Sequence, residues 1–278
     1  WSSDVCSSDL QALSGLMSQI GVEGAEPCKV QVPAVDMTTG FLGTVAVLGA
    51  LQARTRSGTG QYLDVSMYNS ALMLQQTGIA SYLASAELPR RIGSAAPYAA
   101  PNEAYRTADG WIMVAAYQAP RWRALCELLG LGAEVETDPR FADNDARVRN
   151  REALRALVEA RLAQRTTAQW QPLLEARDIM CAPVADYAWV TGSEQFQHVG
   201  AAVSMDLPSG ARFQVPGFLM GDRSAQARVR YAPPSIGQHS REILEEFGLT
   251  PDEVRQLIDR GAVIDNPAHE RAHAGAKP

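Results

Sequence analysis

The stretch PAVDMTTGFLGTVAVLGALQARTRSGTGQYLDVSMY, residues 33–68, decides the fold prediction, because it contains a helix pattern followed by a strand pattern. Residues 38–54 form the helix candidate, with Thr38 or Thr39 as its cap and Arg54 at its C-terminal end. Glycine and alanine recur along it and let another backbone approach closely. Each glycine costs about 1 kcal/mol relative to alanine, so packing must offset that cost. We expect a buried helix.

The second half of this stretch alternates apolar and polar residues. Residues 62–68, YLDVSMY, show this period of two after the turn SGTGQ, and the pattern predicts a strand. Residues 69–86 then show the period of a helix. Further along the chain, residues 103–117 predict two short strands about a turn at Asp109 and Gly110.

Helices are predicted at five later places. Gly130 ends the first, over residues 120–130. Two amphipathic helices follow over residues 150–165 and 166–178. Another covers residues 240–248, with Ser240 as its cap and Gly248 at its end. The last begins at Thr250, where Pro251 and Glu253 complete a capping box. Changes in composition near residues 90–100 and 190–215 suggest a middle domain flanked by two pieces of another.

The composition of the chain limits the classes of function that it can have. The chain has 278 residues, 46% of them hydrophobic and 20% charged, which fits a globular protein. A net charge of −6 disfavours a general nucleic-acid binder. The longest apolar run is broken by Gly, Thr and Gln, so we expect no membrane span. The four cysteines form no CxxC pair, and we expect reduced thiols in a cytoplasmic protein without a metal site.

The segment WSSDVCSSDL, residues 1–10, differs from everything that follows. It contains the near-duplicate SSDV and SSDL, shows no helix or strand period and lacks the apolar stretch of a signal peptide. We expect it to be a non-native segment resembling translated adapter sequence, with the native sequence resuming near Gln11. The alternative is a natural polar arm.

Asp36 has two readings. As a helix cap, it would bind free N–H groups at the positive end of the helix dipole, a contribution of about 1 kcal/mol. As a reagent, it would be a carboxylate in a site where the small residues Ala34, Gly40 and Gly43 leave room for a ligand. The chain has no phosphate loop, GxGxxG, GxSxG or HExxH motif. The arginine-rich residues 140–165 are interleaved with acids, which is typical of a solvated helix face.

The order of seven segments carries a resemblance. QALSGLM, PAVDMTTGFLGTVAVLGAL, SGTGQYLDVSMYNSAL, EAYRTADGWIMVA, DPRF, CAPV and PPSIGQHSREILEEFGLTPDEVRQLIDRGAV follow one another from Gln11 to Val263. In this order they resemble the class III coenzyme A-transferases, the family of formyl-CoA transferase, carnitine CoA-transferase and the related α-methylacyl-CoA racemases. The resemblance covers nearly the whole native part.

The resemblance implies an α/β fold: a large Rossmann-like domain, incomplete here, with an inserted smaller α+β domain. On this basis we expect residues 11–92 to be part of the large domain. Residues 93–190 form the small domain, residues 191–264 a linker and return to the large domain, and residues 265–278 a disordered tail. The family forms interlocked homodimers. We expect the N-terminal portion of the large domain, which holds most of the coenzyme A-binding residues, to be absent.

The family's nucleophile lies in the segment that matches VDMTTG, so the resemblance implies that Asp36 attacks the thioester of an acyl-CoA. The implied substrates are an acyl-CoA, with coenzyme A itself as the transferred group, and a carboxylic acid. The region matching IGSAAP is glycine-rich in formyl-CoA transferase and closes over the site. Here it makes Gly93, Ser94 and Ala95 the expected substrate loop, although Gly93 is its only glycine.

Two other functions stay open. The racemases of the family use an upstream histidine as a second acid/base, and counting back from Asp36 ends at Cys6, inside the non-native segment. Asp36 could therefore be one half of an acid/base pair in a racemase or epimerase. The other alternative is an inactive fragment whose only action is subunit association.

Overall fold

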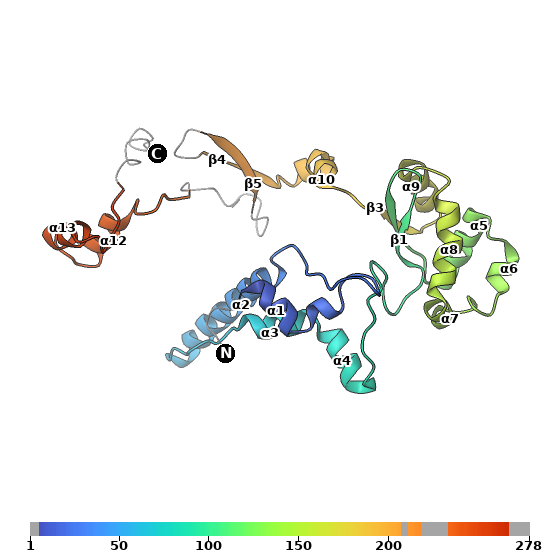
Figure 1. Cartoon of the computed structure of the whole chain (residues 1–278), viewed down its shortest axis with the longest axis horizontal. Helices are drawn as coiled ribbons and strands as arrows, with labels where there is room; N and C mark the ends of the chain where they lie inside the picture. Colours follow the sequence, from blue (N-terminus) through green and yellow to red (C-terminus); the bar gives the residue numbers. More distant parts are fainter. Residues whose placement is uncertain (1–5, 207–210, 218–232, 267–278) are drawn as a thin grey trace. The chain divides into compact units, whose positions relative to one another are not determined.

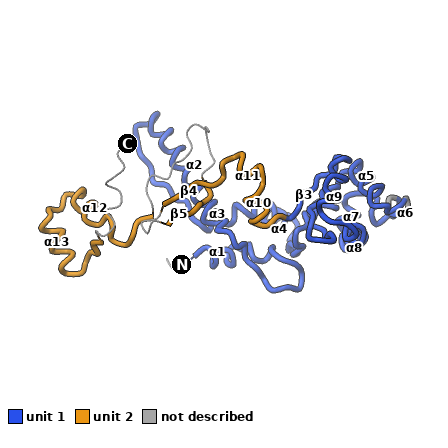
Figure 2. The backbone as a smooth tube through the Cα atoms, turned by 90° about the horizontal axis from the view of Figure 1, so that it is seen from above, with its two compact units in different colours: residues 1–184 blue, residues 185–278 orange. Residues whose placement is uncertain are grey.

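The computed structural model describes residues 6–206, 211–217 and 233–266. It divides into two compact units, residues 1–184 and 185–278, which Figure 2 colours separately. The domain boundaries expected from the sequence stay predictions. The expected tail falls mostly on residues 267–278, outside the described residues.

The first unit begins with a helical part, drawn in blue to cyan in Figure 1. Its elements are α1 (Ser7–Leu13), the 3-10 helix η1 (Leu16–Ser18), α2 (Ala34–Ser57), α3 (Met67–Leu74) and α4 (Gln76–Ser85). Helices α1, α2 and α3 pack against one another, and each contributes one buried apolar side chain: Leu10, Val35 and Ala71. Gly58 ends α2 in the left-handed conformation, with φ of 71°.

Helix α2 corrects one prediction. Only Val35 is buried along its 24 residues, whereas Val45 is 67% and Leu48 is 61% exposed. The prediction of a buried helix is therefore wrong for this chain. Helices α1 and α3 cover only part of α2, so the small residues that suit close packing have no neighbour here. A Cβ built at Gly40, for example, meets nothing within 4 Å.

The length and composition of α2 also meet the criteria for a membrane span, with a mean hydropathy of 1.5. Core helices of water-soluble proteins meet the same criteria. The expectation that the protein has no membrane partner stays a prediction.

The predicted strand over residues 62–68 does not form. Residues 59–66 have no regular structure, Tyr62 is 92% exposed, and α3 begins at Met67 with Ser66 as its cap. A period of two becomes a strand only when a neighbouring strand accepts its hydrogen bonds, and none lies beside these residues in the described chain. The single helix expected over residues 69–86 is interrupted at Gln75.

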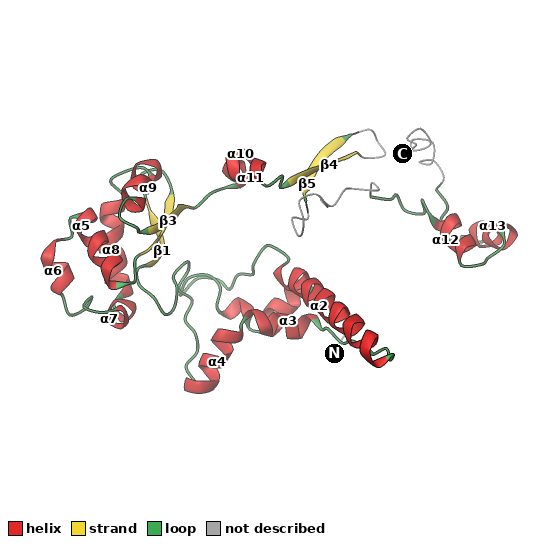
Figure 3. Ribbon diagram, turned by 180° about the vertical axis from the view of Figure 1, so that it is seen from behind, coloured by secondary structure: helices red, strands yellow, loops and turns green. Residues whose placement is uncertain are grey.

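The rest of the first unit is an α+β part. The antiparallel sheet β1-β2-β3 comprises β1 (Asn102–Arg106), β2 (Trp111–Ala115) and β3 (Met180–Pro183). The helices are α5 (Ala119–Leu129), α6 (Gly132–Thr137), α7 (Asn144–Arg149), α8 (Arg151–Leu162) and α9 (Thr167–Glu175). Figure 3 shows α5, α8 and α9 beside the sheet. The predicted hairpin is confirmed, with Tyr105 opposite Ile112.

The core of the first unit lies between this sheet and its helices. Buried side chains alternate along β1 and β2, as expected for strands with one covered face. The members of the core include Tyr105, Ile112, Val114, Trp122, Leu125, Phe141, Leu154, Val158, Leu162, Trp170 and Leu174. Most of the buried hydrophobic residues of the described chain therefore lie between residues 93 and 184.

The second unit contains α10 (Tyr187–Gly192), α11 (Glu194–His198), the hairpin of β4 (Ala202–Asp206) and β5 (Arg212–Pro216), α12 (Ser240–Glu246) and α13 (Pro251–Asp259). The capping box predicted at α13 is confirmed: the Thr250 side chain accepts from the Glu253 N–H, and the Glu253 carboxylate accepts from the Thr250 N–H at 2.8 Å.

Candidate active site

Asp36 is the third residue of α2. Pro33 is the N-cap and makes no side-chain cap bond; the chain enters the helix through a bond of 2.7 Å from the Ala34 N–H to the Val32 carbonyl. The first N–H groups of a helix lack intrahelical acceptors, and the aligned peptide dipoles add positive potential there. The carboxylate of Asp36 therefore lies in the turn where a negative charge is most stabilised.

The two readings of Asp36 differ in what its side chain should contact. The side chain is exposed, and within the described residues no hydrogen bond or ion pair reaches its carboxylate. Asp36 is thus an acid at the start of a helix without being a hydrogen-bonded cap. Whether it is the nucleophile stays a prediction.

Thr38 and Thr39 were predicted as caps, and this prediction is wrong. Both lie inside α2, because the helix begins four residues earlier than Thr38, at Ala34. The Thr39 hydroxyl donates to the Val35 carbonyl at 2.7 Å, a bond that a threonine inside a helix commonly makes.

The space beside Asp36 is open on the glycine side of the helix. A Cβ built at Gly40 or Gly43 meets no atom within 4 Å. Two surface hollows occur elsewhere in the described chain, one between α10 and α11 and one lined by α8 residues, and neither includes Asp36.

The expected substrate loop, residues 93–95, is held at both ends. Gly93 has φ of +64°, and its N–H donates to the Gly21 carbonyl at 2.8 Å. A side chain there would meet the Val22 methyl Cγ1 at 3.2 Å, so both backbone and space favour glycine. The Ser94 hydroxyl accepts from the Ala104 N–H at 3.0 Å. None of these bonds reaches Asp36 in the described residues.

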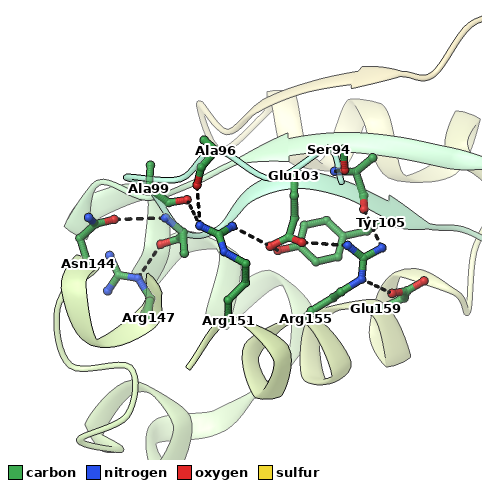
Figure 4. Close-up of polar contacts among 12 residues, drawn as sticks. Ser94, Ala96, Ala99, Glu103, Tyr105, Asn144, Arg147, Arg151, Arg155 and Glu159 are labelled. Atoms are coloured by element: carbon green, nitrogen blue, oxygen red, sulfur yellow. Dashed lines mark hydrogen bonds and ion pairs between the residues drawn. The ribbon is translucent and has the colours of Figure 1, made fainter. Parts of the chain in front are cut away.

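A polar cluster follows the loop, and sequence reasoning missed it (Figure 4). The carboxylate of Glu103 is 1% exposed and pairs with Arg151 at 3.2 Å and with Arg155 at 2.8 Å. Arg147, 2% exposed, donates to three carbonyls, including that of Ala100 at 2.7 Å. Burial lowers the pKa of Arg147 from its ordinary value.

The cluster corrects the interpretation of residues 140–165 as a solvated helix face. Arg147 and Arg151 precede Leu154, Val158 and Leu162 at spacings of four, three, four and four residues. This is the spacing of one helix face, and the three apolar residues are buried. The phase of the apolar residues was the signal that could have placed both arginines toward the interior.

Tyr105 completes the cluster. Its hydroxyl donates to Glu103 at 3.4 Å. Burial, and then the negative charge of Glu103, raise the pKa of Tyr105 well above its ordinary value. The phenol therefore stays protonated and serves as a donor. The described residues contain no group of three His, Cys, Asp or Glu side chains arranged to hold a metal ion.

Known proteins resemble the chain over most of its length. Residues 6–240 match the profile of CoA-transferase family III. The chain is 30% identical over 254 residues to the succinyl-CoA:glutarate CoA-transferase of Mus musculus, covering 91% of this chain and 58% of that protein. It is 32% identical over 246 residues to the succinyl-CoA:mesaconate CoA-transferase of Haloarcula marismortui, covering 86% and 60%.

Two solved structures are also similar to this chain over most of its length. A CAIB/BAIF family protein from Brucella suis matches with a TM-score of 0.68 at 30% identity, over 85% of this chain and 61% of that chain. Rv3272 from Mycobacterium tuberculosis matches with a TM-score of 0.69 at 27% identity, over 84% and 62%. The chain thus spans about three fifths of the length of these four relatives. With a family profile that covers most of its residues, the chain belongs to CoA-transferase family III.

Proposed function

We propose that this chain is part of an enzyme that moves coenzyme A between an acyl-CoA and a carboxylic acid, with Asp36 as the nucleophile. One structural observation carries the proposal: Asp36 is an exposed acid in the first turn of a 24-residue helix, and no described group occupies its carboxylate. The names of the similar proteins support the reaction class, since they are CoA-transferases.

The proposed reaction has four steps, which balance without ATP because thioester and anhydride are both activated acyl groups. The Asp36 carboxylate attacks the thioester carbonyl. The C–S bond breaks, coenzyme A departs as the thiolate, and a mixed anhydride of Asp36 and the acyl group remains. The thiolate attacks the aspartyl carbonyl, which releases the first acid and forms an aspartyl thioester. The acceptor carboxylate attacks that thioester, giving a second anhydride and free thiolate. The thiolate attacks the acceptor's acyl carbon, which forms the new acyl-CoA and regenerates Asp36.

The helix start suits these steps. The attacking carboxylate lies at the positive end of the α2 dipole, where backbone N–H groups can bind an anion. Free N–H groups in the first turn are the kind of donor that stabilises the negative oxygen of a tetrahedral intermediate. The acids in the relatives' names, glutarate and mesaconate, each carry two carboxyl groups. We extend the proposal to an acceptor of this class.

The assembly belongs to the same proposal. We propose a Rossmann-like large domain and an interlocked homodimer in the cytoplasm, in which further protein covers α2. The exposed apolar side chains of α2, among them Phe41, Val45 and Leu48, support a covered helix.

Hydroxylamine trapping tests the reaction. The complete gene product is incubated with an acyl-CoA and hydroxylamine, and peptides are analysed by mass spectrometry. A hydroxamate on residue 36 is expected, and Asp36→Asn should abolish it. Glu87→Gln, at another exposed acid, should leave it unchanged. Exchange of solvent deuterium into the α-carbon without any trapped hydroxamate would instead indicate a racemase.

A further inference from the structure

A row of polar side chains crosses two consecutive helices and faces one short segment. Asn144 and Arg147 come from α7, and Arg151 and Arg155 from α8. They are spaced by three, four and four residues, so they follow one side of the helices. All four donate to backbone carbonyls between residues 96 and 104. Figure 4 shows Arg151 with its partners Ala96, Ala99 and Glu103.

The first two side chains hold the end of this segment next to β1. The Asn144 amide donates to the Tyr98 carbonyl at 2.9 Å, and its oxygen accepts from the Ala100 N–H at 3.2 Å. Arg147 donates to the Ala100 carbonyl at 2.7 Å. These bonds begin only five residues after Gly93, which is bound to Gly21 on the other side.

Arg151 reaches nearest to the expected substrate loop. Its Nη2 donates to the carbonyls of Ala96 at 2.5 Å and Ala99 at 2.9 Å, while its Nη1 donates to Glu103 at 3.2 Å. One planar guanidinium therefore connects the residues that follow the loop to a buried carboxylate. The side chain is 13% exposed, so water offers these carbonyls little competition.

Arg155 also pairs with Glu103, but among the described residues it makes no bond to residues 93–99. Its Nη1 pairs with the other oxygen of Glu103 at 2.8 Å, and its Nη2 donates to the Ala104 carbonyl, inside β1, at 3.2 Å. The two arginines lie one helical turn apart and divide one carboxylate between them. Only Arg151 connects Glu103 to residues before the sheet begins.

Besides the bonds of Asn144 and Arg151, this segment is held by the bond of Gly93 to Gly21 and that of Ser94 to Ala104, and by the Ala96 N–H, which donates to the Asn102 carbonyl at 2.9 Å. From Gly93 to Ala99 its side chains are small except for Tyr98, which is 72% exposed. Such a segment buries little apolar surface, so its conformation depends on backbone hydrogen bonds. Arg151 is the side chain that donates to the carbonyls of Ala96 and Ala99, and the Ala96 carbonyl also accepts from the Ala99 N–H at 3.5 Å.

We propose that Arg151 is a positioning residue: held by Glu103, it fixes the carbonyls of Ala96 and Ala99 and so keeps residues 93–95 in one conformation for the carboxylic acid substrate. The link to substrate rests on the proposed function. The effect of Arg151 on the conformation of residues 93–95 does not depend on the proposed function.

The test compares two matched substitutions, Arg151→Lys and Arg155→Lys. A lysine keeps a positive charge beside Glu103 but cannot span a carboxylate and two carbonyls as the guanidinium does. Amide hydrogen exchange is measured on this chain, over peptides covering residues 93–99. Loss of charge-assisted bonds should speed exchange there about tenfold in Arg151→Lys. In Arg155→Lys, exchange in these peptides should stay near that of the unsubstituted chain.

Transferase kinetics on the complete gene product add the substrate readout. Arg151→Lys should raise KM for the acid several-fold and leave kcat nearly unchanged, since a preorganised loop chiefly assists binding. Arg155→Lys should change neither constant.

Equal exchange in the two variants would overturn the proposal, and so would faster exchange in an active enzyme without a change in KM. If the unsubstituted protein transfers no coenzyme A, the proposed function fails, while the exchange comparison still decides the effect on the loop. Should Arg151→Lys fail to fold, the double variant Glu103→Gln with Arg151→Met takes its place, because it leaves no unpaired carboxylate. The same difference in exchange is then required of it.

Discussion

Val35 and Asp36 are adjacent in the first turn of α2 and have opposite environments: Val35 is completely buried, and Asp36 is exposed. Val35 is the buried residue of α2, the helix that packs against α1 and α3. Because consecutive helical residues point about 100° apart, a buried Val35 turns the next side chain outward. The same packing that orders this turn therefore leaves the carboxylate accessible.

The first prediction concerns Asp36 itself. Asp36→Asn should abolish coenzyme A transfer in the complete gene product, because an amide cannot serve as the attacking carboxylate. The free energy of unfolding should fall by less than about 1 kcal/mol, since only the favourable interaction with the helix dipole is lost. Activity and denaturant unfolding are measured on the same preparation. Loss of folding would assign Asp36 a structural role instead.

The second prediction concerns the buried carboxylate of Glu103. Glu103→Ala should lower the free energy of unfolding by about 3–5 kcal/mol, because Arg151 and Arg155 then lose their shared partner in the interior. Asp138→Asn is the matched control at the more exposed Asp138–Arg140 pair and should lower the stability much less than Glu103→Ala does. Equal costs in urea unfolding would show that Glu103 is not the centre of the cluster.

The third prediction separates two buried tryptophans. The Trp170 indole donates to the Leu162 carbonyl at 2.7 Å, whereas the Trp122 indole N–H has no acceptor among the described residues. Trp170→Phe removes a made bond and leaves Leu162 with only a longer one, of 3.4 Å, from Arg165. It should therefore destabilise the protein by about 1 kcal/mol more than Trp122→Phe does. Urea midpoints in the reverse order would contradict the structure of this core.

The fourth prediction is a pH dependence. The Asp109 carboxylate accepts from the Thr167 N–H at 2.8 Å and from the hydroxyls of Thr107 and Thr167, and these bonds lower its pKa. A lowered pKa in the folded state means that Asp109 stabilises the fold above the ordinary carboxyl pKa of about 4. That stabilisation is lost as the pH falls through the lowered value.

Asp109→Asn should therefore flatten the acid side of the stability profile, measured as urea midpoints below neutral pH. Asp145→Asn serves as the control, because the Asp145 side chain makes no hydrogen bond or ion pair within the described residues. Parallel acid profiles for the unsubstituted chain and Asp109→Asn would contradict the prediction.

Much of the local structure follows from residues close together in the sequence. The hairpin turn at Asp109 and Gly110, the helix end at Gly130 and the capping box at Thr250 were each predicted and are confirmed. All three depend on backbone geometry or hydrogen bonds within a few residues.

The predictions that failed depend on distant neighbours. Residues 62–68 have the period of a strand, but a strand requires a partner that the described chain does not place there. The small residues of α2 favour a buried helix, yet burial requires a surface to pack against, and α1 and α3 cover only part of it. Sequence patterns of this kind favour a strand or a buried helix, but the element forms or becomes buried only when other parts of the chain pack against it.

By itself, the sequence determined the hairpin, the helix end at Gly130, the capping box at Thr250 and the resemblance that singled out Asp36, because each of these is encoded in short contiguous segments. Only the tertiary structure decided that Arg147 and Arg151 face the interior and bind the carbonyls of residues 96–100. Their charge alone predicts that these arginines lie on a solvent-exposed helix face. Their burial becomes favourable only when a carboxylate from β1 and a row of backbone oxygens, distant in sequence, are brought within hydrogen-bonding distance.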